Sequence, residues 1–91
     1  MAIVGIFDEN NKIIKVKTFY NMSEARREML ANLTLYSKLN AIEKRVDTSY
    51  IKLKNGKVIK ILYPPYMGYM TDDAEIVSIL RHEQLTEKYR G

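Results

Sequence analysis

The sequence predicts an α+β domain in which one antiparallel sheet of about four strands packs on one long helix, in two layers. Three observations support this fold class. Two pairs of β-rich segments flank short Asn-containing turns, a long stretch without Gly or Pro follows the first pair, and a shorter helical pattern lies near the C-terminus. The expected order of elements is therefore β-β-α-β-β-α.

The first hairpin is predicted from two β-rich segments, residues 2–7 and 13–19, which flank a polar turn. The turn is centred on Asn10-Asn11, and Asn tolerates the positive φ that a two-residue hairpin turn requires. A two-residue turn at this point would place Phe7 opposite Ile14.

A helix is expected after this hairpin, with Asn21 or Ser23 as its N-cap. Apolar residues then recur at spacings of three and four, as they do on one face of an amphipathic helix. They are Ala25, Met29, Leu33, Tyr36 and Leu39. Residues 22–47 contain neither Gly nor Pro, so the helix can run to about Val46, or end earlier near Asn40 where the pattern weakens.

A second hairpin is predicted at residues 48–63, with its turn at Asn55-Gly56, the strongest short-range hairpin signal. A two-residue turn would pair Leu53 with Val58. In that register one face is mainly apolar and the other mainly basic. Lys60 would then lie on the apolar face and the isoleucines at 59 and 61 on the basic one, which a bulge, an edge position or a covering partner would explain.

The two hairpins resemble each other in sequence, because residues 10–16 return in similar form as residues 55–61. Their continuations differ. The second passes through a loop, residues 63–70, that holds three tyrosines, two methionines and two adjacent prolines. A second helix is expected after it, capped by Thr71 or Asp72. Its apolar residues are Ala74, Ile76, Val77, Ile79 and Leu80.

Length and composition indicate one small domain, residues 1–91, that is 46% hydrophobic. No apolar run approaches the roughly 20 residues that cross a bilayer, and the apolar N-terminal segment is typical of a strand, not of a signal peptide. The chain has no Cys, which excludes disulfides, a thiol nucleophile and cysteine metal sites. These features favour a cytoplasmic protein.

Motifs for catalysis, cofactors and metals are not found in the sequence. It has no nucleophile elbow, no glycine-rich phosphate loop and no HExxH. The single histidine, His82, is followed by Glu83, but adjacent helical residues point about 100° apart and would not chelate one ion. We therefore expect a non-enzymatic protein without a cofactor or a metal site.

Our first functional hypothesis is a nucleic-acid-binding module, because the two hairpins are lysine-rich within a chain of net charge +4. Lysines attract phosphates, and an exposed aromatic ring can stack on a base. The candidate residues are Lys15, Lys17, Tyr50, Lys52, Lys54 and Lys57. The alternative reading is an ordinary solvated strand face, whose lysines protect sheet edges from aggregation.

The second hypothesis is a protein-interaction module, either a homodimer or a small inhibitor from a virus or mobile element. Abundant Lys, Ile, Asn and Tyr are typical of the AT-rich genomes that such elements carry. Tyr and Met are common at interfaces. The interface candidates are Tyr63, Tyr66, Met67, Tyr69, Met70, Ile59 and Ile61. The loop could instead close over the core as a lid, and a third possibility is a nucleotide or small-ligand binder at a dimer seam.

Overall fold

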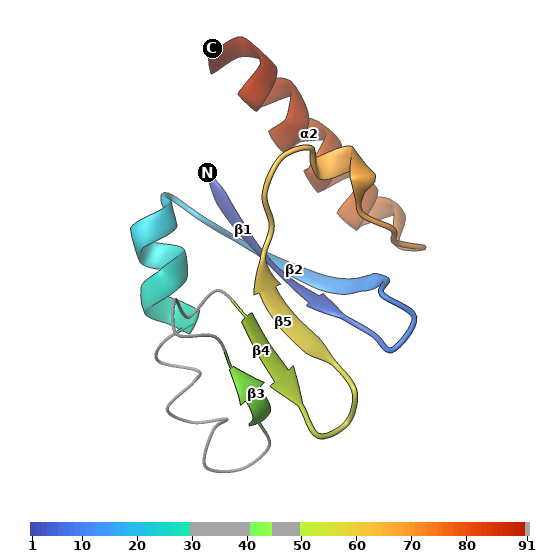
Figure 1. The fold of residues 1–91 in the computed structure, drawn as a ribbon. Helices are drawn as coiled ribbons and strands as arrows, with labels where there is room; N and C mark the ends of the chain where they lie inside the picture. Colours follow the sequence, from blue (N-terminus) through green and yellow to red (C-terminus); the bar gives the residue numbers. More distant parts are fainter. Residues whose placement is uncertain (30–40, 45–49, 91) are drawn as a thin grey trace.

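The computed structural model describes residues 1–29, 41–44 and 50–90 and has an α+β fold (Figure 1). Its strands form one antiparallel sheet in the order β2-β1-β5-β4-β3. The strands are β1 (Ala2–Phe7), β2 (Ile13–Phe19), β3 (Ala41–Lys44), β4 (Tyr50–Leu53) and β5 (Val58–Ile61). A short 3-10 helix, η1 (Tyr66–Gly68), precedes helix α2 (Ala74–Arg90). The predicted antiparallel sheet and C-terminal helix are confirmed.

The first helix begins as predicted, and residues 22–29 are helical. Its cap is Asn21, whose Oδ1 accepts a hydrogen bond of 2.9 Å from the backbone N of Glu24. The prediction that this helix runs to about Val46 is wrong, because Ala41–Lys44 is strand β3 and pairs with β4. The expected apolar stripe through Leu33, Tyr36 and Leu39 lies outside the described residues.

Both hairpins turn through three-residue loops, not the predicted two-residue ones. In the first, Asn11 N donates to Asp8 O at 3.1 Å and Asp8 N donates to Lys12 O at 2.9 Å. The second repeats this pattern between residues 53 and 57, with the same two distances. The third loop residue has positive φ in each case, 62° at Asn11 and 86° at Gly56. The sequence repeat is therefore a repeat of one turn geometry.

The added loop residue changes the register of the first hairpin. Phe7 lies opposite Ile13, not Ile14, and the register shifts at a bulge beside Ile6. Ile13 is consequently buried and Ile14 is 44% exposed.

The same change shifts the second hairpin by one residue, so that Val58 lies opposite Lys52, not Leu53. A one-residue shift exchanges the two faces of a strand. Ile59 and Ile61 therefore lie on the buried face and Lys60 on the other, which removes the mismatch that the predicted register contained.

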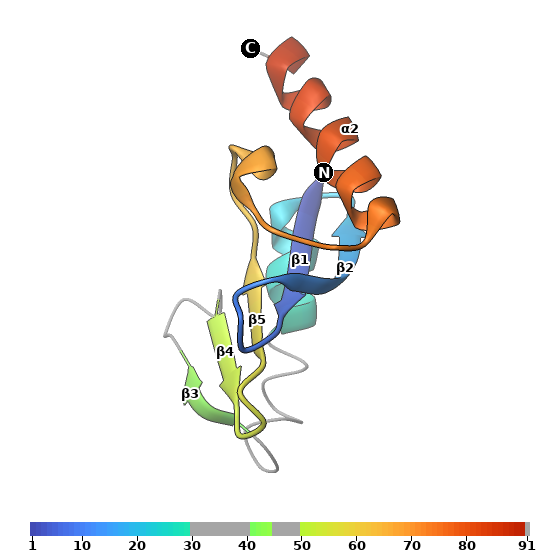
Figure 2. The ribbon, with the colours of Figure 1, turned by 90° about the vertical axis from the view of Figure 1, so that its right-hand side faces the viewer.

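The sheet carries an apolar cluster on each face. The first-face core joins the sheet to helix 22–29 and contains Ala2, Ala25, Met29, Ile51, Leu53, Ile59 and Ile61. The second-face core joins it to η1 and α2 and contains Ile3, Phe7, Ile13, Leu62, Tyr66, Ile76 and Leu80. Strand β1 contributes alternate residues to both. The two helices thus cover opposite faces, and α2 extends past the end of the sheet (Figure 2).

Helix α2 is capped by Asp73, not by the predicted Thr71 or Asp72. Asp73 Oδ1 accepts hydrogen bonds from the backbone N atoms of Glu75 at 2.8 Å and Ile76 at 3.3 Å. Thr71 instead donates from Oγ1 to Ile13 O at 2.7 Å, which ties this segment to β2. In the described part of the chain, no helix combines the length and apolar character needed to cross a membrane.

Candidate functional site

The predicted lysine surface divides between the two faces of the sheet. Lys15 and Lys17 pair across β1 with Ile6 and Val4, so they lie on the face of helix 22–29. Lys52 lies opposite Val58, which packs against the second-face core. The six predicted residues therefore do not form one continuous surface.

Three of those lysines, from both hairpins, line one open groove of about 680 Å³ at the turn end of the first face. We call it the basic groove. Its lysines are Lys15 on β2 and Lys54 and Lys57 in the second turn. Its other lining residues are Ile6, Ile14, Leu53, Asn55 and Ile59. The groove therefore combines an apolar floor with a cationic rim.

The three groove lysines lack carboxylate partners among the described residues. The lysines that form ion pairs in this part of the chain are Lys12 and Lys17. Lys12 Nζ lies 2.9 Å from Asp72 Oδ2, and its hydrogen bond with that carboxylate raises the pKa of Lys12 above 10.5. The three groove lysines thus form a cluster of positive charge at the turn end of this face.

The backbone that carries the groove lysines is fixed by side chains in the turns. Asn55 Oδ1 accepts a hydrogen bond of 3.0 Å from Lys57 N in the second turn. In the first, Asp8 Oδ1 accepts from Asn10 N at 2.8 Å and Lys12 N at 3.0 Å. These bonds fix the local backbone of each hairpin turn.

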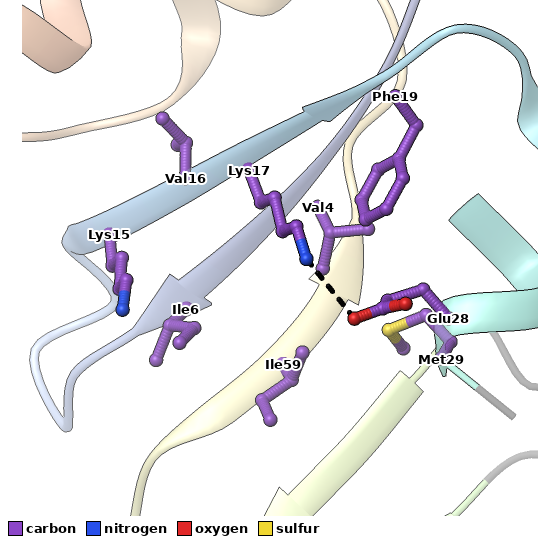
Figure 3. Close-up of a pocket in the computed structure, with 9 residues that line it drawn as sticks. All are labelled: Val4, Ile6, Lys15, Val16, Lys17, Phe19, Glu28, Met29 and Ile59. Carbon is purple, nitrogen blue, oxygen red and sulfur yellow. Dashed lines mark hydrogen bonds and ion pairs between the residues drawn. The ribbon is translucent and has the colours of Figure 1, made fainter. Parts of the chain in front are cut away.

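A smaller apolar cavity of about 160 Å³ adjoins the basic groove (Figure 3). Its lining comprises Val4, Ile6, Lys15, Val16, Lys17, Phe19, Glu28, Met29 and Ile59. The cavity shares Ile6, Lys15 and Ile59 with the groove. Across it, Lys17 Nζ forms an ion pair of 3.1 Å with Glu28 Oε1 on helix 22–29.

The opposite face holds a separate arrangement of lysines and aromatic rings. Lys60 Nζ lies 4.3 Å from the ring centroid of Phe7, whose ring centroid is 5.9 Å from that of Tyr69. Tyr50 lies directly opposite Lys60 on the neighbouring strand. Because Tyr50 is on this face, it cannot stack on a base held in the basic groove.

The predicted interface residues also divide. Ile59 and Ile61 are 5% and 3% exposed and belong to the first-face core, so they do not form the predicted protein interface. Tyr66 is likewise 3% exposed, in the second-face core, and its backbone N donates to Gln84 Oε1 at 2.7 Å. The prediction that Ile59, Ile61 and Tyr66 form an interface is therefore wrong, because all three side chains are buried.

The rest of the loop is held in place while three of its side chains stay in solvent. Tyr69 Oη accepts a hydrogen bond from Tyr63 N at 3.0 Å and donates one to Tyr63 O at 3.2 Å. Tyr63, Met67 and Met70 remain 45%, 48% and 53% exposed. The loop thus closes over the second-face core through Tyr66 and Tyr69, and presents the other three outward.

Sequence reasoning missed the contributions of Ile6, Phe19 and Glu28 to this site. Glu28 sits among other charged helix residues, and only the register of β2 reveals that it faces Lys17. In the described ranges, no group of three or more His, Asp or Glu side chains could hold a metal ion, and His82 is exposed. No family model, curated protein or solved structure matches this chain.

Proposed function

We propose that this protein binds single-stranded nucleic acid in the basic groove, without catalysis. One observation supports the proposal above others: three lysines from two hairpins, all without carboxylate partners in the described chain, surround one groove with an apolar floor. Lysines of this kind attract phosphates. The unstacked bases of a single strand can contact the apolar side chains, whereas a duplex keeps its bases stacked inside the helix.

The groove suits binding that is largely independent of sequence. Lys15, Lys54 and Lys57 can contact phosphates, and among the lining residues that the structure describes, Asn55 offers a polar uncharged side chain for a base edge. With three phosphate contacts on a single strand, the logarithm of the binding constant should fall with the logarithm of salt concentration at a slope of about −2.

The test is fluorescence anisotropy with a labelled mixed-sequence oligonucleotide, single-stranded or duplex, across a salt series. We expect the single strand to bind more tightly. The double variant Lys54→Glu/Lys57→Glu should lose most of the affinity and of the salt slope. Arg81→Glu on the exposed side of α2 introduces the same kind of charge reversal and is the control. Undetectable binding at low salt, or an equal loss in the control, would contradict the proposal.

A second candidate function is protein interaction through Tyr63, Met67 and Met70, including self-association. It is favoured by their exposure on a loop whose backbone is fixed by Tyr69, since preorganised side chains lose less entropy on binding. Sedimentation equilibrium tests the self-associating form. A dimer mass that becomes a monomer mass in Met67→Asp would support it, and a monomer mass for the parent protein at high concentration would contradict it.

A further inference from the structure

We infer that the apolar cavity beside the basic groove is a binding site for a small carboxylate with an apolar tail of about the size of a phenyl ring. This ligand differs from nucleic acid, and the cavity is a separate space that shares Ile6, Lys15 and Ile59 with the basic groove. The inference stands on the cavity's lining, its volume and the charges at its rim.

The interior of the cavity is apolar. Val4 and Ile6 of β1 and Ile59 of β5 line it from the sheet, and Phe19 and Met29 line it from the end of β2 and from helix 22–29. The volume is about 160 Å³. A protein cavity of about 150 Å³ with a similar aliphatic and aromatic lining is large enough to bind benzene. The interior therefore fits one apolar group of that size.

The rim selects an anion. Lys17 and Glu28 neutralise each other through their ion pair of 3.1 Å. Lys15 also lines the cavity, and it has no carboxylate partner among the described residues. Among the lining residues that the structure describes, one positive charge is thus left over, which a carboxylate complements and an ammonium group does not.

Lys15 is positioned to hold the head group while the tail enters the cavity. It lines both the cavity and the groove, so its side chain lies where the two spaces meet. A ligand anchored there can bind without breaking the Lys17–Glu28 ion pair. The same pair lies across the cavity and would cover an inserted tail (Figure 3).

The test is an NMR titration of the ¹⁵N-labelled protein with 3-phenylpropionate, 3-phenylpropanol and 3-phenylpropylamine, which share one tail and differ in head group. A fragment of this size should bind with a dissociation constant on the order of 1 mM. We expect the acid to shift the amide signals of Phe19 and Met29, and the amine to bind at least about tenfold more weakly. Equal binding of all three probes, or no binding of the acid, would overturn the inference.

Three variants locate the site and separate it from nucleic-acid binding. Lys15→Gln should weaken the binding of the acid at least about fivefold and leave the binding of the alcohol unchanged. A merely structural role for Lys15 would not produce this difference. Val4→Phe should fill the cavity and abolish binding of both probes. Lys54→Glu/Lys57→Glu should still bind the acid, whether or not the parent protein binds oligonucleotides. Retained acid binding in a correctly folded Val4→Phe, or loss of it in the double variant, would place the ligand elsewhere.

Discussion

The side chain of Glu9 lies against the backbone of Gly56, so that the tips of the two hairpins touch. A β-carbon at position 56 would lie 2.8 Å from Cγ of Glu9, closer than real β-carbons approach their neighbours. The pairing of β1 with β5 puts both turns at one end of the sheet, where Lys15, Lys54 and Lys57 line the basic groove.

Gly56→Ala should destabilise the protein by about 1–2 kcal/mol, because Gly56 has φ of 86° and an L-residue is strained in that region. Urea unfolding measures the change. Glu9 is exposed and can rotate away from an added methyl group, so most of the loss should persist in the Glu9→Ala background. If the loss disappears in the double variant, crowding and not backbone strain is its cause.

Ile13→Ala should destabilise the protein by about 2–5 kcal/mol, whereas Ile14→Ala should change its stability by no more than about 0.5 kcal/mol. The reason is the bulged register of the first hairpin, which buries Ile13 and leaves Ile14 44% exposed. The two variants remove the same atoms from adjacent positions, so each is the control for the other. Equal losses would contradict the bulge.

Tyr66→Ala should cost about 3–5 kcal/mol of stability, because its ring is buried among the residues of the second-face core. Met67→Ala, next to it but 48% exposed, should stay within about 0.5 kcal/mol. Thermal unfolding compares the two. A large loss in Met67→Ala would mean that this side chain is covered, for example by a second copy of the chain.

Tyr69→Phe isolates the hydrogen bonds that close the loop. The variant keeps the ring beside Phe7 but removes the hydroxyl that bonds to both backbone polar groups of Tyr63. We expect a loss of about 0.5–1.5 kcal/mol in urea unfolding. A change near zero would indicate that water replaces both bonds without cost.

The ion pair between Lys12 and Asp72 should contribute a pH-dependent share of stability. The hydrogen bond with Asp72 raises the pKa of Lys12 above 10.5 in the folded protein, so the folded state binds that proton more tightly. The contribution is complete well below pH 10.5 and is lost as pH rises through the raised pKa. The difference in melting temperature between the parent protein and Asp72→Asn should therefore shrink at high pH, and also in high salt. A constant difference would contradict this assignment.

The sequence was sufficient for the fold class and both hairpins, because Asn55-Gly56 and alternating β-rich segments are strong local signals. It did not reveal the registers. A three-residue loop with one positive-φ residue and a two-residue loop with two such residues both favour Asn and Gly, so Asn11 and Gly56 fit either. Strand β3 was missed because Ala41–Lys44 is short and continues a segment without helix breakers.

The site was only partly predictable for the same reason. Lys15, Lys54 and Lys57 were expected to act together and do line one groove, but Tyr50 and Lys52 lie on the other face. The face on which a side chain lies depends on the strand register, and an error of one residue moves every side chain of the strand to the opposite face. The pairing of Glu28 with Lys17 depends on how helix 22–29 sits over the sheet, which local sequence patterns do not encode.

The alternate packing of β1 into both cores has a consequence for folding kinetics. β1 pairs on one side with β2, its neighbour in sequence, and on the other with β5, where Val4 meets Ile61. Neither hydrophobic cluster is complete until β1 pairs with β5, so the two clusters cannot fold independently of each other. We expect a single cooperative transition whose rate is set by closing this long connection, with the amides of β1 and β5 the slowest to exchange with solvent.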